Sequence, residues 1–243
     1  MNDSNPLIRL ENDLLESVDV ILLDIEGTTT PIQFVTETLF PYARKKMAEF
    51  LNKQATTLTD DLRLLGIEHA VDLQAGNNPP SLVVPEDYLF WLMEQDRKSP
   101  ALKSIQGKIW KAGYESGELK GELYADVAPA VKRWCSSGKR VCIYSSGSVL
   151  AQKLLFGNTA SGNLLPLLAG HFDTTVGGKK QSASYTKIAS ELSTDPQHIV
   201  FFSDIVEELA AAAEAGVQTI LVCRDQTPLE PVDHVIVTNF ESL

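Results

Sequence analysis

Short apolar segments recur along the chain, and each has the length and β-branched composition of a strand that is buried on both faces. The first is VDVILLD at 18–24, which ends at Asp24 before Gly27 and Pro31 interrupt the pattern. The later ones are RVCIYSS (140–146), HIVFFSD (198–204), VQTILVC (217–223) and HVIV (234–237), with HFDTTVG (171–177) as a weaker candidate. The pattern predicts a strand at each of these places.

Segments with helical spacing of apolar residues lie between the later strands. They are APAVKRWCSSGK (128–139), SVLAQKLLFG (148–157), SASYTKIASEL (182–192) and VEELAAAAEAG (206–216). Because strand and helix alternate, the connections are right-handed crossovers and the sheet is parallel. We therefore expect an α/β fold of the Rossmann-like kind.

The chain between the first two strands has a different character, because it contains helical patterns and no convincing strand. PYARKKMAEFL (41–51), Thr59–Leu73, PEDYLFWLMEQDRK (85–98) and ALKSIQGKIWKAGY (101–114) predict about four helices, two of which open at a proline. The sequence thus predicts an α/β core of residues 1–33 and 122–243, with an all-helical insert, 34–121, placed after the first strand as a lid.

Polar side chains follow several of these strands at the point where each strand ends. They are Asp24 and Glu26, Ser145 and Ser146, Lys179 and Lys180, and Asp204. Since open α/β sheets bind ligands at the carboxyl ends of their strands, we expect these groups to share one site.

Phosphoryl transfer is the chemistry that uses this set of groups. Asp24 and Asp204 offer the oxygen ligands that suit Mg²⁺, which cancels the repulsion between a carboxylate and a phosphate dianion. Lys179 adds positive charge, and Ser145 and the following helix N-terminus donate hydrogen bonds to the phosphate. Glu26 is placed to protonate the leaving oxygen and then to activate water.

Each feature taken alone has a simpler structural interpretation. A carboxylate at a strand end, such as Asp24 or Asp204, is often a turn former or a helix cap, and a serine run is often an N-cap. Lys179 and Lys180 alone read as a solvated pair. The catalytic interpretation rests on the agreement of order, spacing and strand-end placement.

Composition and charge narrow the function classes. The chain has 243 residues with 44% hydrophobic and 22% charged residues, which is typical of a globular protein. A net charge of −11 disfavours nucleic-acid binding, and no apolar run reaches the roughly 18 residues of a membrane span. The polar start, MNDSNPLIRLENDLL, does not resemble a secretory signal. We therefore expect a cytoplasmic protein without nucleic-acid or membrane partners.

Cysteine and histidine usage adds little chemistry. The three cysteines are Cys135, Cys142 and Cys223, and their odd number and wide spacing argue against disulfides and a zinc site. Cys142 and Cys223 lie in strand-like runs, so we expect buried thiols. The four histidines show no ligand spacing.

The segment DIEGTT at 24–29 resembles the first motif of the haloacid-dehalogenase superfamily, Asp-x-Asp-Gly-Thr, with Glu26 at the second acid. With Glu at the second acid, the segment is similar to the corresponding motif of the acireductone-forming enolase-phosphatase family of methionine salvage. The similarity extends to DRKSPALKSIQGKIWKAGYESGELKGELYADV (96–127), IYSSGSVLAQKLLFG (143–157), GHFDTTVGGKKQSASYTKIA (170–189) and FFSDIVEELAAA (201–212).

This resemblance implies a role for each matching residue. Asp24 is the nucleophile and a ligand of one Mg²⁺ per subunit, and Asp204 is the second metal carboxylate. Glu26 is the acid/base and also falls at a metal position, through its side chain or its backbone carbonyl. The substrate-phosphate positions are Ser145, Ser146 and Lys179, and Glu208 falls at a further acidic position whose role stays open.

The resemblance also implies the reaction. The family converts 2,3-diketo-5-methylthiopentyl 1-phosphate, by enolisation and then dephosphorylation, into 1,2-dihydroxy-3-keto-5-methylthiopentene, and it generally acts as a monomer. The alternatives are a magnesium-dependent phosphatase or phosphomutase acting on another small phosphate ester, a non-catalytic binding module, and a dehalogenase. Glu26 and the insert argue against the first, the complete acid and lysine set against the second, and Asp204 against the third.

Overall fold

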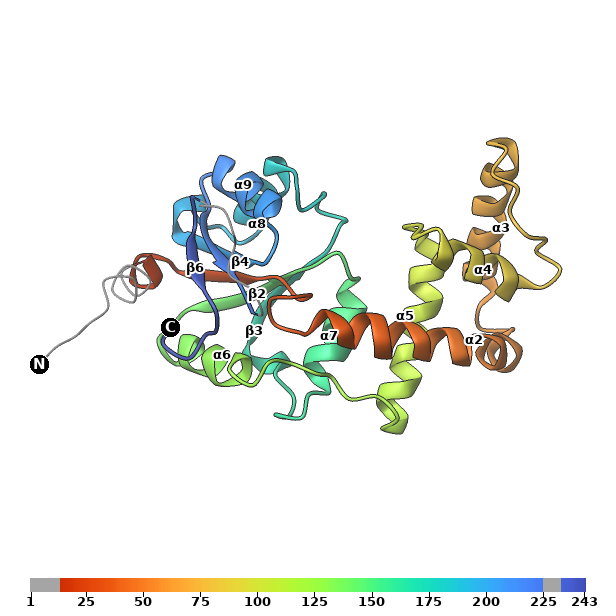
Figure 1. Ribbon diagram of the computed structural model, residues 1–243, viewed down its shortest axis with the longest axis horizontal. Coiled ribbons are helices and arrows are strands. Elements are labelled where there is room, and N and C mark those ends of the chain that lie inside the picture. The colour runs from red at the N-terminus through yellow and green to blue at the C-terminus, as the bar shows by residue number, and fades with distance from the viewer. Residues whose placement is uncertain (1–13, 225–232) are drawn as a thin grey trace, which may run out of the picture. The chain divides into compact units, whose positions relative to one another are not determined.

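The computed structural model describes residues 14–224 and 233–243, and the chain divides into two compact units. One unit runs up to Ile32 and resumes at Lys120, and the other is Gln33–Leu119. The chain is coloured along its length in Figure 1. Most of the polar N-terminal stretch that bears on a signal sequence lies outside the described residues.

The larger unit contains a six-stranded, wholly parallel sheet in the order β3-β2-β1-β4-β5-β6. The strands are β1 (Val20–Leu23), β2 (Arg140–Tyr144), β3 (Leu168–Phe172), β4 (Ile199–Ser203), β5 (Gln218–Val222) and β6 (Val235–Val237). The predicted α/β class and parallel sheet are therefore confirmed.

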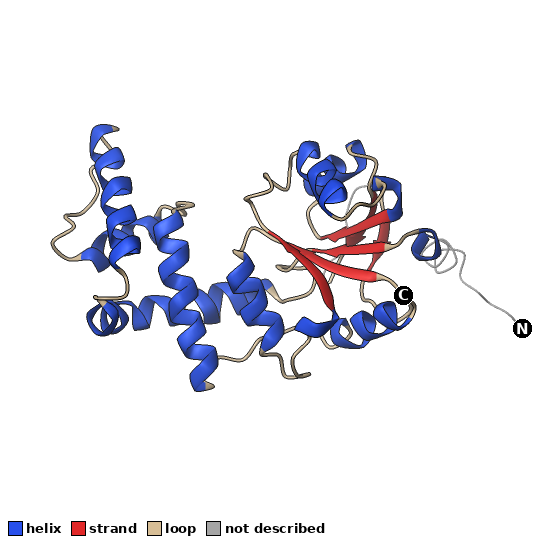
Figure 2. Ribbon diagram, turned by 180° about the vertical axis from the view of Figure 1, so that it is seen from behind, coloured by secondary structure: helices blue, strands red, loops and turns tan. Residues whose placement is uncertain are grey.

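Both faces of the sheet are covered by helices, which explains why its strands are apolar at nearly every position. The helices are α6 (Val127–Ser136), α7 (Val149–Gly157), α8 (Ser182–Glu191) and α9 (Val206–Glu214). Leu22 packs in one cluster with Tyr185 of α8 and Leu209 of α9. On the opposite face Trp134 of α6 lies 5.8 Å from the ring of Phe202. Figures 1 and 2 show these two helical layers with the strands between them.

The third strand is displaced from its predicted position. We predicted it at 171–177, but β3 is Leu168–Phe172. The chain turns after Phe172 because the Asp173 carboxylate accepts hydrogen bonds from the backbone N–H of Thr175, at 2.9 Å, and from its hydroxyl, at 2.7 Å. Such a local side-chain turn competes with a strand, so Asp173 ends β3 where the apolar pattern suggested a continuation.

The smaller unit is helical in all its regular elements. It contains a π-helix, η1 (Phe34–Leu39), and the α-helices α2 (Phe40–Gln54), α3 (Thr59–Gln74), α4 (Pro85–Glu94) and α5 (Pro100–Ser116). The π-helix was not predicted, and α4 ends earlier than the predicted 98 because Asp96 adopts a left-handed φ of 45°. Ser99 caps α5 by accepting a hydrogen bond from Leu102 N. No helix in the two described ranges is both long and apolar enough to cross a bilayer.

The cysteines differ in their burial, and all three are free thiols. Cys142 is fully buried in β2, as predicted. Cys223 follows β5 and is only half-buried, so the prediction of a buried thiol is wrong for this residue. Its strand-like segment ends before it, at Val222, where the chain leaves the sheet.

Candidate active site

Asp24 lies at the centre of the sheet, at the carboxyl end of β1. In the register of the sheet Leu23 is paired with Ile143 of β2 and with Phe202 of β4. The residues that follow these three strands therefore leave the sheet at one edge. The backbone N–H of Asp24 still donates to Phe202 O at 3.0 Å, which fixes the position of the aspartate relative to β4.

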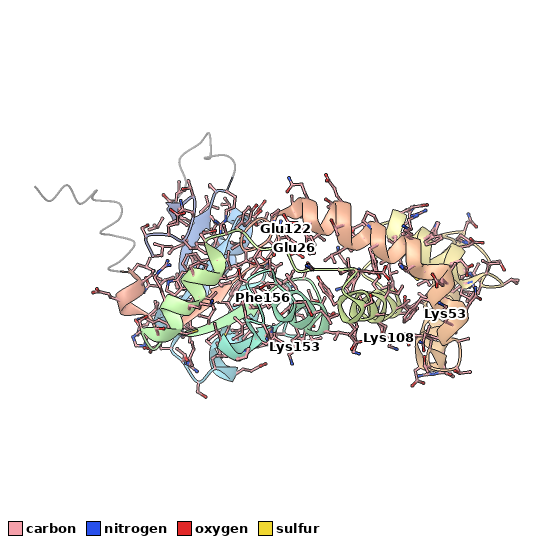
Figure 3. All side chains as sticks on the ribbon, turned by 90° about the horizontal axis from the view of Figure 1, so that it is seen from below. Glu26, Lys53, Lys108, Glu122, Lys153 and Phe156 are labelled. Carbon is pink, nitrogen blue, oxygen red and sulfur yellow. The ribbon has the colours of Figure 1, made fainter. Side chains whose placement is uncertain are left out.

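The loop after Asp24 is a tight turn held by its own backbone. Ile25 O accepts hydrogen bonds from the N–H groups of Thr28, Thr29 and Thr30 at 3.2, 2.9 and 2.9 Å. Gly27 N donates to Thr30 O at 2.9 Å, and Gly27 has a φ of +73° that favours glycine. The turn reverses the chain within a few residues and so keeps Glu26 close to Asp24. Figure 3 labels Glu26 on this loop.

The Asp24 side chain is buried, with 2% of its surface exposed. Its Oδ1 atom accepts a hydrogen bond from Ile25 N at 2.7 Å and lies 2.6 Å from Nζ of Lys179. The predicted nucleophile and the predicted phosphate lysine are thus in direct contact. They come from positions separated by more than half of the chain, and the sheet topology brings them together.

The structure distinguishes the two adjacent lysines sharply. Lys179 is 9% exposed. Its loop is anchored because Tyr185 Oη donates to Lys179 O at 2.6 Å and Ser184 Oγ donates to Gly178 O at 2.8 Å. The Lys180 side chain is 63% exposed, and its Nζ lies 3.8 Å from Glu207. Only the first lysine of the pair therefore faces the buried carboxylates.

Glu208 occupies a position in the site that the sequence left open. Its Oε2 atom lies 2.6 Å from Lys179 Nζ and accepts a hydrogen bond from Ser203 Oγ at 3.0 Å. Ser203 Oγ in turn accepts from Ile205 N at 3.1 Å, so the strand end and the start of α9 are tied together. Glu208 is thus a partner of the lysine. The sequence marked Glu208 only through the resemblance of FFSDIVEELAAA, which left its role open.

The three serines after β2 have different surroundings. Ser145 is fully buried, and its hydroxyl donates to Glu26 Oε2 at 3.1 Å and accepts from Gly147 N at 3.0 Å. Ser148 is the N-cap of α7 and accepts a hydrogen bond from Ala151 N. Ser146 is exposed, on the loop between them. The capping interpretation therefore holds for Ser148, while Ser145 lies beside the predicted acid/base.

Gln152 of α7 holds this loop in place through its side-chain amide. It was not selected as a site residue from the sequence. Its side chain is buried, and Nε2 donates to Gly147 O at 3.0 Å and to Phe172 O at 2.7 Å. One amide thus holds the serine loop against the end of β3. A glutamine within an ordinary amphipathic helix pattern carries no signal for such a contact.

Asp204 follows β4 and is the remaining predicted acid. It does not cap α9, because the N-cap residue is Ile205 and makes no side-chain cap. Burial raises the pKa of Asp204 to about 6, and the negative charges of Glu208 and Glu26 act in the same direction. The geometry places this carboxylate against Gly27, in the loop that carries Asp24 and Glu26.

The electrostatics of the site are dominated by carboxyl groups. Burial raises the pKa of Asp24 and is opposed by the Lys179 ammonium, while Glu26 and Glu208 add to the rise. Burial acts to lower the pKa of Lys179, but Asp24 and Glu208 outweigh it and leave this pKa above its usual value. Asp24 and Glu208 both contact the ammonium of Lys179. The charges of Glu26 and Glu208 also act on Asp24 and Asp204, so among the described residues the carboxyl groups of the site outnumber its buried ammonium.

The carboxylate oxygens of the site are donors of the kind that suit a hard cation. Within residues 14–224 and 233–243 no group of three or more His, Cys, Asp or Glu side chains is arranged to hold a metal. Mg²⁺ needs less, because it keeps several waters and binds through one or two carboxylates together with substrate phosphate oxygens. Asp24 and Asp204 are the predicted carboxylates of this kind, and a divalent cation held by them would offset the excess negative charge.

Comparison with known proteins agrees with this fold and site. A family model described as "Hydrolase: haloacid dehalogenase-like hydrolase" matches residues 18–216. The chain therefore belongs to the haloacid dehalogenase-like hydrolases. It is 47% identical to Enolase-phosphatase E1 of Synechococcus elongatus over 235 residues, covering 93% of this chain and 98% of that protein. Within the hydrolase family it thus belongs with the enolase-phosphatases.

Two further relatives support this placement. The chain is 44% identical to Enolase-phosphatase E1 of Drosophila mojavensis, covering 93% of this chain and 95% of that protein. The crystal structure of the Unknown transcript 4 protein (UTR4) of Saccharomyces cerevisiae matches with a TM-score of 0.76 and 36% identity, covering 93% of this chain and all of that one. The predicted resemblance is confirmed, and the chain is a phosphatase of the hydrolase class.

Proposed function

We propose that this enzyme converts 2,3-diketo-5-methylthiopentyl 1-phosphate into 1,2-dihydroxy-3-keto-5-methylthiopentene and inorganic phosphate, as the enolase-phosphatase of methionine salvage. The observation that carries the proposal is the buried contact of 2.6 Å between Asp24 and Lys179 at the carboxyl end of the central strand. The contact supports the proposal because it pairs the residue proposed as nucleophile with the lysine proposed to bind phosphate, in a chain whose curated relatives bear the name enolase-phosphatase.

In the phosphatase step Asp24 attacks the phosphorus atom, and the bond between phosphorus and the substrate oxygen breaks. Glu26 gives a proton to that leaving oxygen, and it later takes one from the water that releases phosphate from Asp24. Ser145 donates to Glu26 at 3.1 Å, which supports this role because the contact holds the carboxyl group at the strand end. Lys179, Ser145 and Ser146 are the residues proposed to bind the phosphate oxygens. The Ser145 hydroxyl has one proton to donate, so it turns from Glu26 to the phosphate when substrate binds.

We assign one Mg²⁺ per subunit to Asp24 and Asp204, with Glu26 contributing through its side chain or its backbone carbonyl. When bound, the cation supplies positive charge that neutralises the phosphate and stabilises an enolate. The engagement of the Glu26 side chain with Ser145 favours the backbone carbonyl as the ligand.

We further propose that the helical unit Gln33–Leu119 is a cap that selects the substrate. The support is its place in the chain, because it is inserted directly after the loop that carries Asp24 and Glu26. The enzyme is proposed to act as a cytoplasmic monomer on a small phosphate ester. Its net charge of −11 supports the absence of a nucleic-acid partner.

The test is an assay of the purified protein with this diketone phosphate and with a panel of sugar phosphates. We expect phosphate release and the appearance of the acireductone only with the diketone, loss of both in excess chelator, and recovery on addition of Mg²⁺. Ca²⁺ is expected to restore little activity, because its coordination is larger and looser. Preferential hydrolysis of a sugar phosphate would instead make the chain a general phosphatase, and full activity in chelator would exclude the metal.

A further inference from the structure

Arg224 is a buried arginine that the mechanism above does not use. It follows β5 by two residues, and its side chain is 6% exposed. Its Nε and Nη2 atoms both donate to Thr28 O, at 2.9 and 2.7 Å. Its Nη1 atom donates to Asp126 Oδ2 at 2.7 Å. The guanidinium therefore holds one backbone carbonyl with two donors and a buried carboxylate with a third.

Aromatic rings hold the same guanidinium between them. The ring of Tyr124 lies 4.3 Å and the ring of Phe240 lies 4.4 Å from its central carbon. Tyr124 N also donates to Thr29 O at 3.0 Å, and Phe240 N donates to Asp126 Oδ2 at 2.6 Å. Three segments that are distant in the sequence thus meet at Arg224. They are the loop after β1, the segment around 124–126 and the end of the chain.

The contacted carbonyl belongs to the turn that carries the chemistry. Thr28 lies two residues after Glu26 and four after Asp24, and its N–H is bonded back to Ile25 O at 3.2 Å. Two donors of one planar guanidinium converge on this oxygen and fix its position, which the single point charge of an ammonium does less firmly. We propose that Arg224 is a positioning residue, which acts through Thr28 O to hold the turn between the nucleophile and the acid/base.

Arg133 offers a natural comparison, because it also holds the end of the chain. Its guanidinium donates to Leu243 O at 3.2 and 3.0 Å and to Phe240 O. Figures 1 and 2 show the C-terminus beside α6, the helix that carries Arg133. None of these contacts reaches the loop after β1. Loss of Arg133 therefore removes anchoring of the C-terminal segment, while loss of Arg224 also frees Thr28.

The inference rests on the proposed function, so the test includes Asp24→Asn as a reference for chemistry at this site. Arg224→Lys keeps the charge opposite Asp126 but cannot supply the fork. With Mg²⁺ and the diketone phosphate, we expect its kcat to fall about 10–100-fold, since small misplacements of reacting groups have effects of this size. Its KM should change little, because Lys179 and Ser145 are untouched. Arg133→Lys, the matched control, should keep its kcat.

Chemical rescue then separates positioning from folding. Arg224→Ala leaves a space between the rings of Tyr124 and Phe240 that a guanidinium ion fits. Millimolar guanidinium chloride is expected to raise its kcat at least several-fold, while lowering or not changing that of the wild type and of Arg133→Ala. A wild-type kcat in folded Arg224→Lys would overturn the inference, as would equal losses in the two arginine variants without rescue. Equal activity of wild type and Asp24→Asn would instead reject the proposed function itself.

Discussion

The α-carbon of Gly27 lies against the carboxylate of Asp204, so that a β-carbon at this position would overlap the Asp204 oxygens. Gly27 also has a φ of +73°. The glycine therefore lets the loop after β1 approach the residue that follows β4. The register of β1 and β4 already brings the ends of the two strands together, and the glycine allows the loop after Asp24 to lie directly against Asp204.

We accordingly expect Gly27→Ala to lower kcat/KM about 100-fold or more, because the added methyl group pushes Asp204 away from the loop. Gly138→Ala is the matched control. Gly138 has a φ of +86°, but among the described residues beyond its chain neighbours no atom lies within 4 Å of where its β-carbon would be. Both variants should lose about 1–2 kcal/mol of stability from the left-handed conformation alone. Steady-state kinetics measures the loss of activity of each variant, and urea denaturation measures its loss of stability. Equal kcat/KM values for Gly27→Ala and Gly138→Ala would contradict the argument from the contact between Gly27 and Asp204.

Lys179 and Lys180 are adjacent in the sequence, yet only Lys179 contacts Asp24 and Glu208. We expect Lys179→Ala to lower kcat/KM about 100-fold or more, as the loss of a charged transition-state contact does. Lys180→Ala should have little effect, because its side chain is 63% exposed. Phosphate-release kinetics of the two variants tests this, and the reverse ranking would show that the wrong lysine is assigned.

Glu208 should act by orienting Lys179, since the two side chains lie 2.6 Å apart. Glu208→Gln keeps the size of the side chain but removes its charge, so Lys179 is left to pair with Asp24 alone. We expect kcat/KM to fall about 10-fold, the usual scale for a lost supporting contact. Glu207→Gln, one residue away and 68% exposed, should be silent. An unchanged kcat/KM in Glu208→Gln would contradict the role of Glu208 in orienting Lys179.

The two half-reactions should separate in Asp24→Asn. Phosphate release needs a carboxylate nucleophile, while enolisation needs a base near C1 and positive charge near the C2 carbonyl. We expect the variant to release no phosphate but still to exchange a C1 proton with solvent. The measurement is NMR at C1 in deuterated water. If exchange disappears while Mg²⁺ binding persists, Asp24 itself takes part in enolisation.

A buried acid in the helical unit should make that unit sensitive to acid. Asp72 is 1% exposed, and it accepts hydrogen bonds from Tyr88 Oη at 2.6 Å and Asn77 Nδ2 at 2.8 Å. Arg97 lies 2.9 Å from it. Burial acts to raise the pKa of Asp72, but these three partners outweigh it and leave the pKa below its usual value.

A depressed folded-state pKa means that the contribution of Asp72 to stability is present above its unfolded pKa of about 3.9 and is lost as the pH falls further. Asp72→Asn should therefore lower the free energy of unfolding by about 1–3 kcal/mol at pH 7. Below pH 4 the difference in stability between the variant and the wild type should become smaller. Thermal denaturation across this range tests it. Asp96→Asn is the control, because the Asp96 side chain is 91% exposed beside Lys98. This variant should have the stability of the wild type both at pH 7 and below pH 4.

The sequence by itself determined the class of the fold and most of its elements. Apolar runs such as 18–24 and 198–204 are strands because a parallel sheet buried on both faces requires them to be apolar throughout. Prolines and acids marked the helix starts of the insert. The failures were local: Asp173 ended β3 through a side-chain turn, and the π-helix Phe34–Leu39 has no distinct apolar period.

The sequence also placed Asp24, Glu26, Ser145 and Asp204 at strand ends, because the carboxyl ends of parallel strands meet by construction. Only the tertiary structure decided which neighbours these groups have. It separated Lys179 from Lys180, since the direction of a loop side chain depends on packing such as that of Tyr185. The contact between Arg224 and Thr28 O is a second example of this kind. In both cases the side chains join segments that are distant in the sequence, and the residues around each of them form no motif. They carry no local pattern, because the fold alone brings the partners together.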